Sequence, residues 1–270
     1  MEFEQIISIH GGPRYGTSWL GQIFDSSKDV RHKWQPLFSD SFKNRVPELN
    51  TKSGFLNYYN DLYNFEDNFL DRTKQKEKGI YPIFDHKDPN PRILVTKHTR
   101  YHYLIPIQIN LLDNITFVAI IRNPCGALNS FRKAPREFDP AWNFTDEWRF
   151  AQKKNEFLPG NYFGFHRWKE FVKLCIEMEK KYPKNFNLIT YEELAQNTDN
   201  CINKLFSQCN LKIESQTIDF ISKSKTIHND DVYSVFKGNK NIYDWQDELP
   251  SEIISEIYNE LKNTEFERFI

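Results

Sequence analysis

The sequence predicts an α/β fold, a single domain with a central parallel sheet flanked by helices. Three observations lead to this prediction. Short β-branched runs alternate with segments of helical periodicity. Two of the runs, 92–99 and 115–122, lack the polar and apolar alternation of half-exposed strands, as expected for parallel strands covered on both faces. No linker rich in Pro, Gly or Ser divides the chain, so residues 1–270 are interpreted as one domain.

The elements are expected in the following order. A buried strand (5–9) leads through a glycine-rich turn into an amphipathic helix (17–27). After the strand at 115–122, Asn123 and Pro124 suit the start of a second helix. Helical periodicity also predicts helices at 162–182, 200–210 and 251–263, and a strand followed by a turn at 185–194.

Two segments interrupt this order, about 35–90 and 133–160. Both are rich in Tyr, Phe, Trp and Asn and show little periodicity. We interpret them as loops that cap the site and bind an acceptor, because aromatic faces with polar neighbours suit sugar rings and phenols. The same residues at helical spacing are also typical of a core.

Composition excludes several function classes. The formal net charge of −1 provides no global basic field for nucleic acid or an anionic membrane. No apolar run approaches the roughly 20 residues that span a bilayer, and the start of the chain lacks the features of a signal peptide. The four cysteines show neither CxxC pairing nor metal-ligand spacing, so we expect no metal, no disulfide and a cytoplasmic protein.

The glycine-rich turn predicts a P-loop-like nucleotide-binding core. Four residues lie between Gly11 and Gly16, and Thr17 and Ser18 follow where a nucleotide-hydrolysing loop would have Lys and then Ser or Thr. Backbone N–H groups and the positive end of a helix bind phosphate or sulfonate without metal. Arg14 offers a bidentate cation instead of the lysine. The alternative interpretation is a structural turn with an exposed arginine.

GGPRYGTSWL resembles the 5'-phosphosulfate loop of the PAPS-dependent sulfotransferase family, usually PRSGTTWL or PKSGTTWL. IIRNPCGALNSF (120–131) is similar to the family's 3'-phosphate motif, in which Arg122 and Ser130 would bind one phosphate. The resemblance assigns the following residues of the first motif to the donor: Gly12, Pro13, Arg14, Tyr15, Gly16, Thr17, Ser18 and Trp19. Tyr15 replaces the usual serine.

Two later segments extend this resemblance. YEEL is similar to a turn that approaches the adenine, with Tyr191 at its start. VFKGNKNIYDWQDEL (235–249) resembles a late loop in which Lys237 and Gly238 would close over the 3'-phosphate. The family implies metal-free transfer of a sulfonate from 3'-phosphoadenosine 5'-phosphosulfate (PAPS) to a carbohydrate or small-molecule hydroxyl, releasing 3'-phosphoadenosine 5'-phosphate (PAP).

The resemblance also implies a catalytic base. Cytosolic members carry a KTH segment after a central strand, whereas this chain has Lys97, His98 and Thr99 in that order. On a strand, a shift of one residue reverses the face to which a side chain points. His98 is the first candidate for the base, followed by His102 and His32. Lys97 is expected to contact the sulfonate or the acceptor.

Two other functions are left open at this point. A small-molecule kinase would fit a loop that differs from a Walker A sequence by one lysine. A nucleotide-binding protein of the same fold without turnover would fit the displaced histidine. Whether the protein forms a homo-oligomer is also left open.

Overall fold

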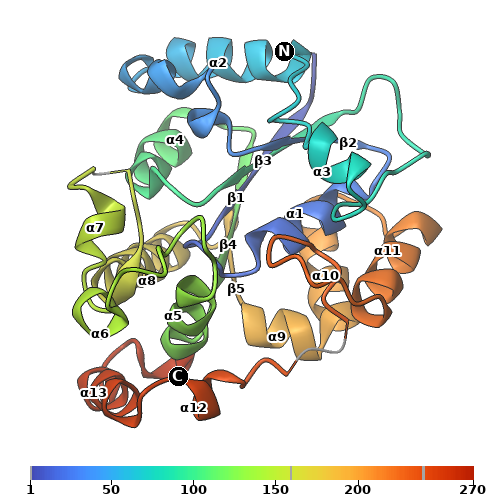
Figure 1. The fold of residues 1–270 in the computed structure, drawn as a ribbon. Coiled ribbons are helices and arrows are strands. Elements are labelled where there is room, and N and C mark those ends of the chain that lie inside the picture. The colour runs from blue at the N-terminus through green and yellow to red at the C-terminus, as the bar shows by residue number, and fades with distance from the viewer. Residues whose placement is uncertain (1, 159, 239–240) are drawn as a thin grey trace.

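A five-stranded sheet forms the centre of the computed structural model, which describes residues 2–158, 160–238 and 241–270. The strands are β1 (Gln5–His10), β2 (Val30–Trp34), β3 (Ile93–His98), β4 (Ile115–Ile121) and β5 (Phe186–Thr190). They pair in parallel in the order β2-β3-β1-β4-β5 (Figure 1). The predicted α/β fold with a central parallel sheet is confirmed.

Helices connect these strands and follow them. The α-helices are α1 (Thr17–Asp25), α2 (Lys52–Asn64), α3 (Thr73–Glu77), α4 (Ile105–Leu111), α5 (Pro124–Arg132), α6 (Phe144–Glu147), α7 (Gln152–Asn155), α8 (Gly164–Lys181), α9 (Tyr191–Gln196), α10 (Thr198–Gln208), α11 (Ser215–Thr226), α12 (Trp245–Glu248) and α13 (Ser251–Leu261). Short 3₁₀ helices are η1 (Pro36–Phe38), η2 (Lys43–Glu48), η3 (His102–Leu104) and η4 (Glu267–Phe269).

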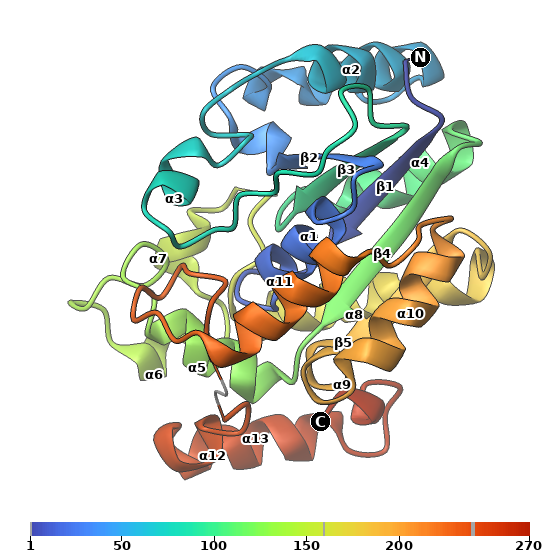
Figure 2. The ribbon, with the colours of Figure 1, turned by 90° about the vertical axis from the view of Figure 1, so that its right-hand side faces the viewer.

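The helices cover the sheet in two layers. In Figure 1 the sheet is seen nearly on edge, with α1, α10 and α11 on one side and α4 and α8 on the other. Figure 2 shows α10 and α11 lying across the near face of the strands. Helix α2 packs at the β2 edge, against β2 and α4. Both faces of the sheet are therefore covered.

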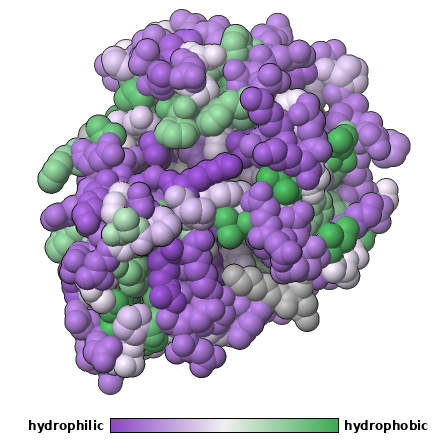
Figure 3. Space-filling model, viewed as in Figure 1, coloured by the Kyte–Doolittle hydropathy of each residue, from purple (hydrophilic) through white to green (hydrophobic). Residues whose placement is uncertain are grey.

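Burial on both faces explains the composition of the central strands. Every residue of β3 and β4 is buried, which suits their continuous apolar runs. Large aromatic side chains, among them Phe117, Trp168 and Phe171, complete the core between the sheet and the helices. The face seen in Figure 3 is in contrast mostly hydrophilic, with apolar residues in scattered groups.

Several elements differ from the sequence-based expectations, among them β2, α2 and α9. The polar sequence VRHKW forms the edge strand β2, which was not predicted. Helix α2 occupies part of the 35–90 segment interpreted as a loop, and its buried aromatic residues belong to the core. The turn expected after β5 is helix α9, because Thr190 caps the N–H of Glu193. At these places the polar and aromatic residues gave no clear helix or strand pattern in the sequence.

The topology brings several strand ends together at one end of the sheet. The central strand β1 has β3 on one side and β4 on the other. Open parallel sheets bind ligands beyond the carboxyl ends of their strands at such a point, where the strand order reverses. The segments that follow β1, β3, β4 and β5 all begin at this end, and they contain most of the motif residues.

Candidate active site

The loop after β1 leads directly into the N-terminus of α1. Gly16, the N-cap, has a φ of +90°, and a Cβ at this position would lie 2.5 Å from the ring of Tyr191. No side chain caps the helix. Its first N–H groups are therefore directed at the carboxyl ends of the strands and suit an anion. Thr17 is buried and Ser18 half-buried in this first turn, while Pro13 is half-buried in the loop.

Tyr15 holds the loop against the core. Its side chain is buried and lies 6.2 Å from the ring of Phe171, measured between centroids. A Cβ on Gly12 would come within 2.4 Å of the Tyr15 ring, so only glycine allows this close approach. Burial raises the pKa of Tyr15 well above its ordinary value, which keeps the hydroxyl protonated.

Arg14 joins three parts of the site. Its backbone has a φ of +72°, its Nε donates to Ser130 Oγ at 3.2 Å, and its Nη2 donates to the carbonyl oxygen of Val232 at 2.8 Å. Ser130 lies on α5 and Val232 precedes the late loop. The structure thus brings the first motif next to the second, although more than 100 residues separate them in the chain.

Arg122 follows β4 and contacts both the loop and α9. Its Nη1 donates to the carbonyl oxygen of Arg14 at 3.0 Å, and its guanidinium carbon lies 4.5 Å from the centroid of the Tyr191 ring. The Nε of this buried side chain has no hydrogen-bond partner. Beside it, the Asn123 side chain caps α5 by accepting from Cys125 N at 2.9 Å. The cap fixes the turn that carries Arg122.

Trp19 and the late loop meet at Ser224 on α11. The indole Nε1 of Trp19 donates to Ser224 Oγ at 2.9 Å, and the backbone N–H of Lys237 donates to the carbonyl oxygen of Ser224 at 3.3 Å. Gly238 has a φ of +59°, which suits glycine. This loop is described as far as Gly238 and again from Asn241.

Lys97 lies at the end of β3 on the face covered by α1. It pairs in register with Trp34, and its Nζ lies 4.9 Å from the centroid of the Trp34 ring. Its side chain is 2% exposed. Burial, with contributions from Arg72 and Arg14, lowers the pKa of Lys97 well below its ordinary value.

Comparison with known proteins identifies the class of this site. Residues 5–264 match the family model described as "Sulfotransferase domain". The chain belongs to the sulfotransferase family. The resemblance of its motifs to PAPS-dependent sulfotransferases, and the enzyme class they predict, are thereby confirmed.

Solved structures of sulfotransferases share this fold at low identity. Mouse sulfotransferase SULT7A1 complexed with PAP is 16% identical, with a TM-score of 0.53 over 98% of this chain and 86% of that one. Retinol dehydratase in complex with androsterone and PAP is 15% identical, with a TM-score of 0.58 over 97% and 82%. The sulfotransferase domain of the Synechococcus PCC 7002 olefin synthase is 12% identical, with a TM-score of 0.52 over 90% and 88%. Comparison with curated proteins gives no match.

The candidate histidines of this sulfotransferase, His98, His102 and His32, lie inside the protein. His98 stacks on His10 with ring centroids 4.8 Å apart, and its Nε2 lies 3.0 Å from Thr96 Oγ1. His102 shares a hydrogen bond of 3.0 Å with His10 between their Nδ1 atoms. Since His98 follows Lys97 on a strand, its side chain points to the opposite face of the sheet.

The rings of His10, His98 and His102 are buried and have the properties of core residues. Desolvation lowers the pKa of His98 to about 3 and that of His10 and His102 in the same direction. His32 lies on β2 beneath α1, where a Cβ on Gly21 would meet its Nε2 at 2.9 Å. Burial lowers the pKa of His32 to about 4. These histidines are therefore neutral at pH 7.

Sequence reasoning missed an acidic residue at the site. The hydroxyl of Tyr233 donates to Glu137 Oε2 at 2.9 Å, and the ring of Tyr233 lies 5.5 Å from the guanidinium carbon of Arg14. Burial lowers the pKa values of Arg14 and Lys97, and the charge of Glu137 opposes both shifts. A sequence signal was absent because Glu137 and Tyr233 are 96 residues apart.

Among the residues that the structure describes, no group of three or more His, Cys, Asp or Glu side chains could hold a metal ion. No helix in the same residues combines the length and the apolar character needed to cross a membrane.

Proposed function

We propose that this sulfotransferase transfers the sulfonate of PAPS to a hydroxyl of a small-molecule or carbohydrate acceptor and releases PAP. The observation that carries the proposal is the Arg14–Ser130 hydrogen bond, with Arg122 bound to the Arg14 carbonyl. These contacts join the loop for the 5' end of the donor to the motif for its 3'-phosphate. The PAP complexes of two proteins of similar fold support the same donor.

The donor is proposed to lie across the carboxyl ends of β1 and β4. Thr17, Ser18 and the free N–H groups of α1 would bind the 5'-phosphosulfate, and Tyr15, Gly12 and Gly16 shape the turn. Arg122 and Ser130 would bind the 3'-phosphate, with Lys237 and Gly238 closing over it. The rings of Trp19 and Tyr191 offer faces for the adenine.

Transfer requires few groups from the protein. The bond between sulfur and the 5'-phosphate oxygen breaks as the acceptor oxygen bonds to sulfur, and the acceptor hydroxyl loses its proton. Arg14 stabilises the charge that builds up on the departing phosphate oxygen. Because arginine stays protonated, this role is electrostatic rather than acidic. Lys97 would bind an oxygen of the sulfonate while the acceptor oxygen attacks sulfur in line with the bond that breaks.

The acceptor proton has two candidate bases. His98 remains the base predicted from the sequence, and its neutral ring can accept a proton, but its low pKa makes it a weak base. Glu137 is the base that the geometry adds, since it lies beside Tyr233 next to Arg14. A protein that binds the donor without turnover is the second candidate function, favoured by the enclosure of all three predicted histidines.

Substitution of Arg14 tests the proposal. Arg14→Ala should lower the rate of sulfonate transfer from labelled PAPS roughly 10²- to 10³-fold. PAP binding should remain measurable, since Arg122 and the α1 N-terminus are retained. Arg14→Lys, which keeps a cation at the leaving oxygen, should recover much of the rate. Equal turnover by wild type and Arg14→Ala would refute this role of Arg14, and absence of transfer by the wild type to every acceptor would favour the silent protein.

A further inference from the structure

A cluster of hydrogen-bond donors includes Lys97, the residue proposed to bind the sulfonate. It is formed by Trp34 at the end of β2, Lys97 at the end of β3, and Arg72 just before α3. The guanidinium carbon of Arg72 lies 3.8 Å from the centroid of the Trp34 ring, and Lys97 Nζ lies 4.9 Å from the same ring. Two cations therefore share one indole.

This donor cluster is only partly matched by acceptors. A hydrogen bond with Tyr81 acts on Arg72, and the charge of Glu137 acts on Lys97. Arg72 is 6% exposed and Lys97 2% exposed. Arg72 Nε and Trp34 Nε1 are both buried without a hydrogen-bond partner. No carboxylate forms an ion pair with Arg72 or Lys97 within the ranges that the structure describes. Burying two cations without a paired carboxylate is unfavourable, so the arrangement suits a site that is completed by an anion.

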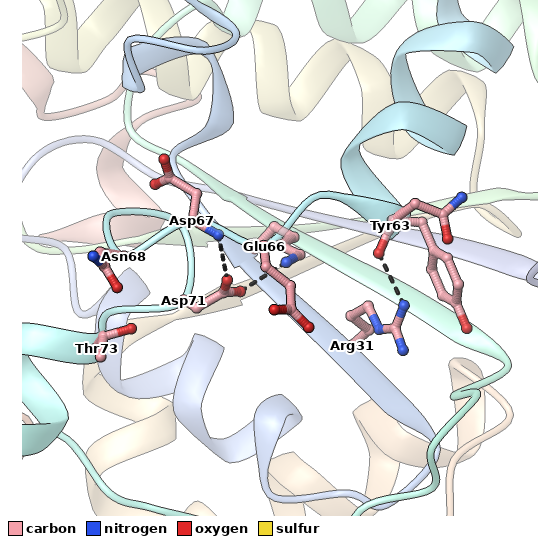
Figure 4. Close-up of a pocket in the computed structure, with 9 residues that line it drawn as sticks. Arg31, Tyr63, Glu66, Asp67, Asn68, Asp71 and Thr73 are labelled. Atoms are coloured by element: carbon pink, nitrogen blue, oxygen red, sulfur yellow. Dashed lines mark hydrogen bonds and ion pairs between the residues drawn. The ribbon is translucent and has the colours of Figure 1, made fainter.

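The chain holds Arg72 in place by several contacts. Its φ of +59° is unusual for a residue with a side chain. Trp34 N donates to the Leu70 carbonyl oxygen at 2.9 Å, and Lys33 Nζ pairs with Asp71 at 2.7 Å. Figure 4 shows Asp71 also accepting from the N–H of Asp67, at the edge of a polar cavity of about 630 Å³. Strained conformations that are held this firmly cluster at functional sites.

The donor cluster meets the proposed sulfonate site at Lys97, whose Nζ lies 4.9 Å from the Trp34 ring, and the guanidinium carbon of Arg72 lies 5.2 Å from the centroid of the Tyr81 ring. The charges of Arg14 and Arg72 both lower the pKa of Lys97, and Tyr81 raises the pKa of both arginines. The N–H of Val235 donates to the carbonyl oxygen of Ile80 at 3.0 Å. This bond joins the segment around Tyr81 to the segment around Val232, whose carbonyl oxygen accepts from Arg14. Arg14 and Arg122 are engaged by the charges of PAPS in the proposed function, so Arg72 is a cation beyond those the donor requires.

We propose that the acceptor carries an anionic group, a carboxylate, phosphate or sulfate, and that Arg72 binds it together with Trp34. This inference rests on the proposed function, because it assigns the substrate class of the same site. The Arg72 guanidinium and the Trp34 N–H would donate to the oxyanion, and Lys97 would lie between it and the sulfonate. The binding would orient the acceptor hydroxyl toward sulfur.

The first test measures anion binding without any acceptor. Protein saturated with PAP is titrated with sodium sulfate against sodium chloride at equal ionic strength, and its thermal midpoint is recorded. We expect sulfate to raise the midpoint of the wild type, and Arg72→Gln to weaken the apparent affinity for sulfate at least tenfold. Arg31→Gln is the matched control, because Arg31 stacks on Tyr63 at 4.1 Å but donates to the carbonyl oxygens of Tyr63 and Pro89.

The second test measures acceptor preference. Glucose 6-phosphate is compared with glucose, and 4-hydroxyphenylacetate with its amide, as acceptors of labelled sulfonate. The wild type should prefer the anionic member of a pair at least tenfold in kcat/KM. Arg72→Gln should remove the preference, because kcat/KM falls much further for the anionic member than for the neutral one, while Arg72→Lys should restore part of it.

Three results would overturn the inference: a sulfate effect of the same size in Arg72→Gln, a preference for neutral acceptors in the wild type, or an equal loss for both members of a pair. The last result would place Arg72 on the donor sulfonate.

Failure of the proposed function is recognised separately, as a lack of PAP binding before sulfate is added. Without PAP, sulfate would also bind at the phosphate sites of Arg122 and the α1 N-terminus, so there the difference between wild type and Arg72→Gln reports on Arg72.

Discussion

Arg14 connects the two halves of the proposed donor site through one side chain. It donates to Ser130 and to the Val232 carbonyl oxygen, and its own carbonyl oxygen accepts from Arg122. Burial lowers the pKa of Arg14, but an arginine starts so high that it keeps its charge. An arginine in place of lysine therefore provides a permanent cation whose planar guanidinium can donate hydrogen bonds along two edges.

The two candidate bases can be separated by substitution. Glu137→Gln keeps the shape of the side chain and removes its ability to take the proton, so kcat should fall roughly 10²- to 10⁴-fold. His98→Asn should leave kcat within a few-fold of wild type if the ring serves only in the core. Single-turnover transfer from labelled PAPS, with PAP affinity as the control for folding, measures both. The reverse pattern would assign the proton to His98.

The turn between β1 and α1 depends on a glycine at its last position. Gly16→Ala adds a Cβ 2.5 Å from the Tyr191 ring at a φ of +90°. We expect a loss of about 1–2 kcal/mol in the free energy of unfolding from the backbone alone, and a further loss from the displaced ring. PAP binding should weaken as well, because the turn aims the N–H groups of α1.

Gly79→Ala is the matched control for this prediction. Gly79 has a φ of +68°, but a Cβ there would meet no atom within 4 Å. It should therefore show the backbone penalty without the clash and without an effect on PAP binding. Denaturant unfolding and PAP titration of the two variants give the comparison. Equal behaviour of both variants would show that the contact between Gly16 and Tyr191 is unimportant.

The buried histidines between β1, β3 and η3 should make the fold sensitive to acid. Burial lowers the pKa of His98 from 6.5 to about 3, so between these values the unfolded chain binds a proton that the native protein does not. This contribution to stability is fully present above pH 6.5 and is lost as the pH falls. The expected slope is about 1.4 kcal/mol per pH unit for each such histidine.

Urea unfolding between pH 7 and pH 5 measures this slope. His98→Gln should reduce this slope by the contribution of one histidine. An unchanged slope in His98→Gln would mean that His98 does not oppose protonation in the native state.

Local sequence patterns predict some of these elements better than others. The runs that form β3 and β4 are rich in β-branched and apolar residues, and their bounds lie within one residue of the prediction. Strand β2 was missed because Arg31, His32 and Lys33 have no strand signal. Their burial depends on partners from other segments, such as Asp71 for Lys33. No local pattern contains this information.

At the scale of the whole molecule, local sequence patterns likewise predict only part of the site. The motif residues around Arg14 and Arg122 were found because each lies within a short recognisable segment. Glu137 and Arg72 were not found, since their partners Tyr233 and Trp34 come from elements distant in the sequence. The parallel topology brings these segments to one end of the sheet. Chemistry built from several strand ends is therefore visible only in the folded chain.

The central claim is that the two strand-ending turns, at 11–16 and 122–130, bind opposite ends of one PAPS molecule without metal. The most direct measurement is the thermal midpoint with PAP in the presence of EDTA. PAP at 100 times its dissociation constant should stabilise the wild type by about 2.7 kcal/mol, or roughly 5–10 °C, and Arg122→Ala should lose most of this shift. No shift with PAP, or a shift only with Mg²⁺ and ATP, would contradict the claim.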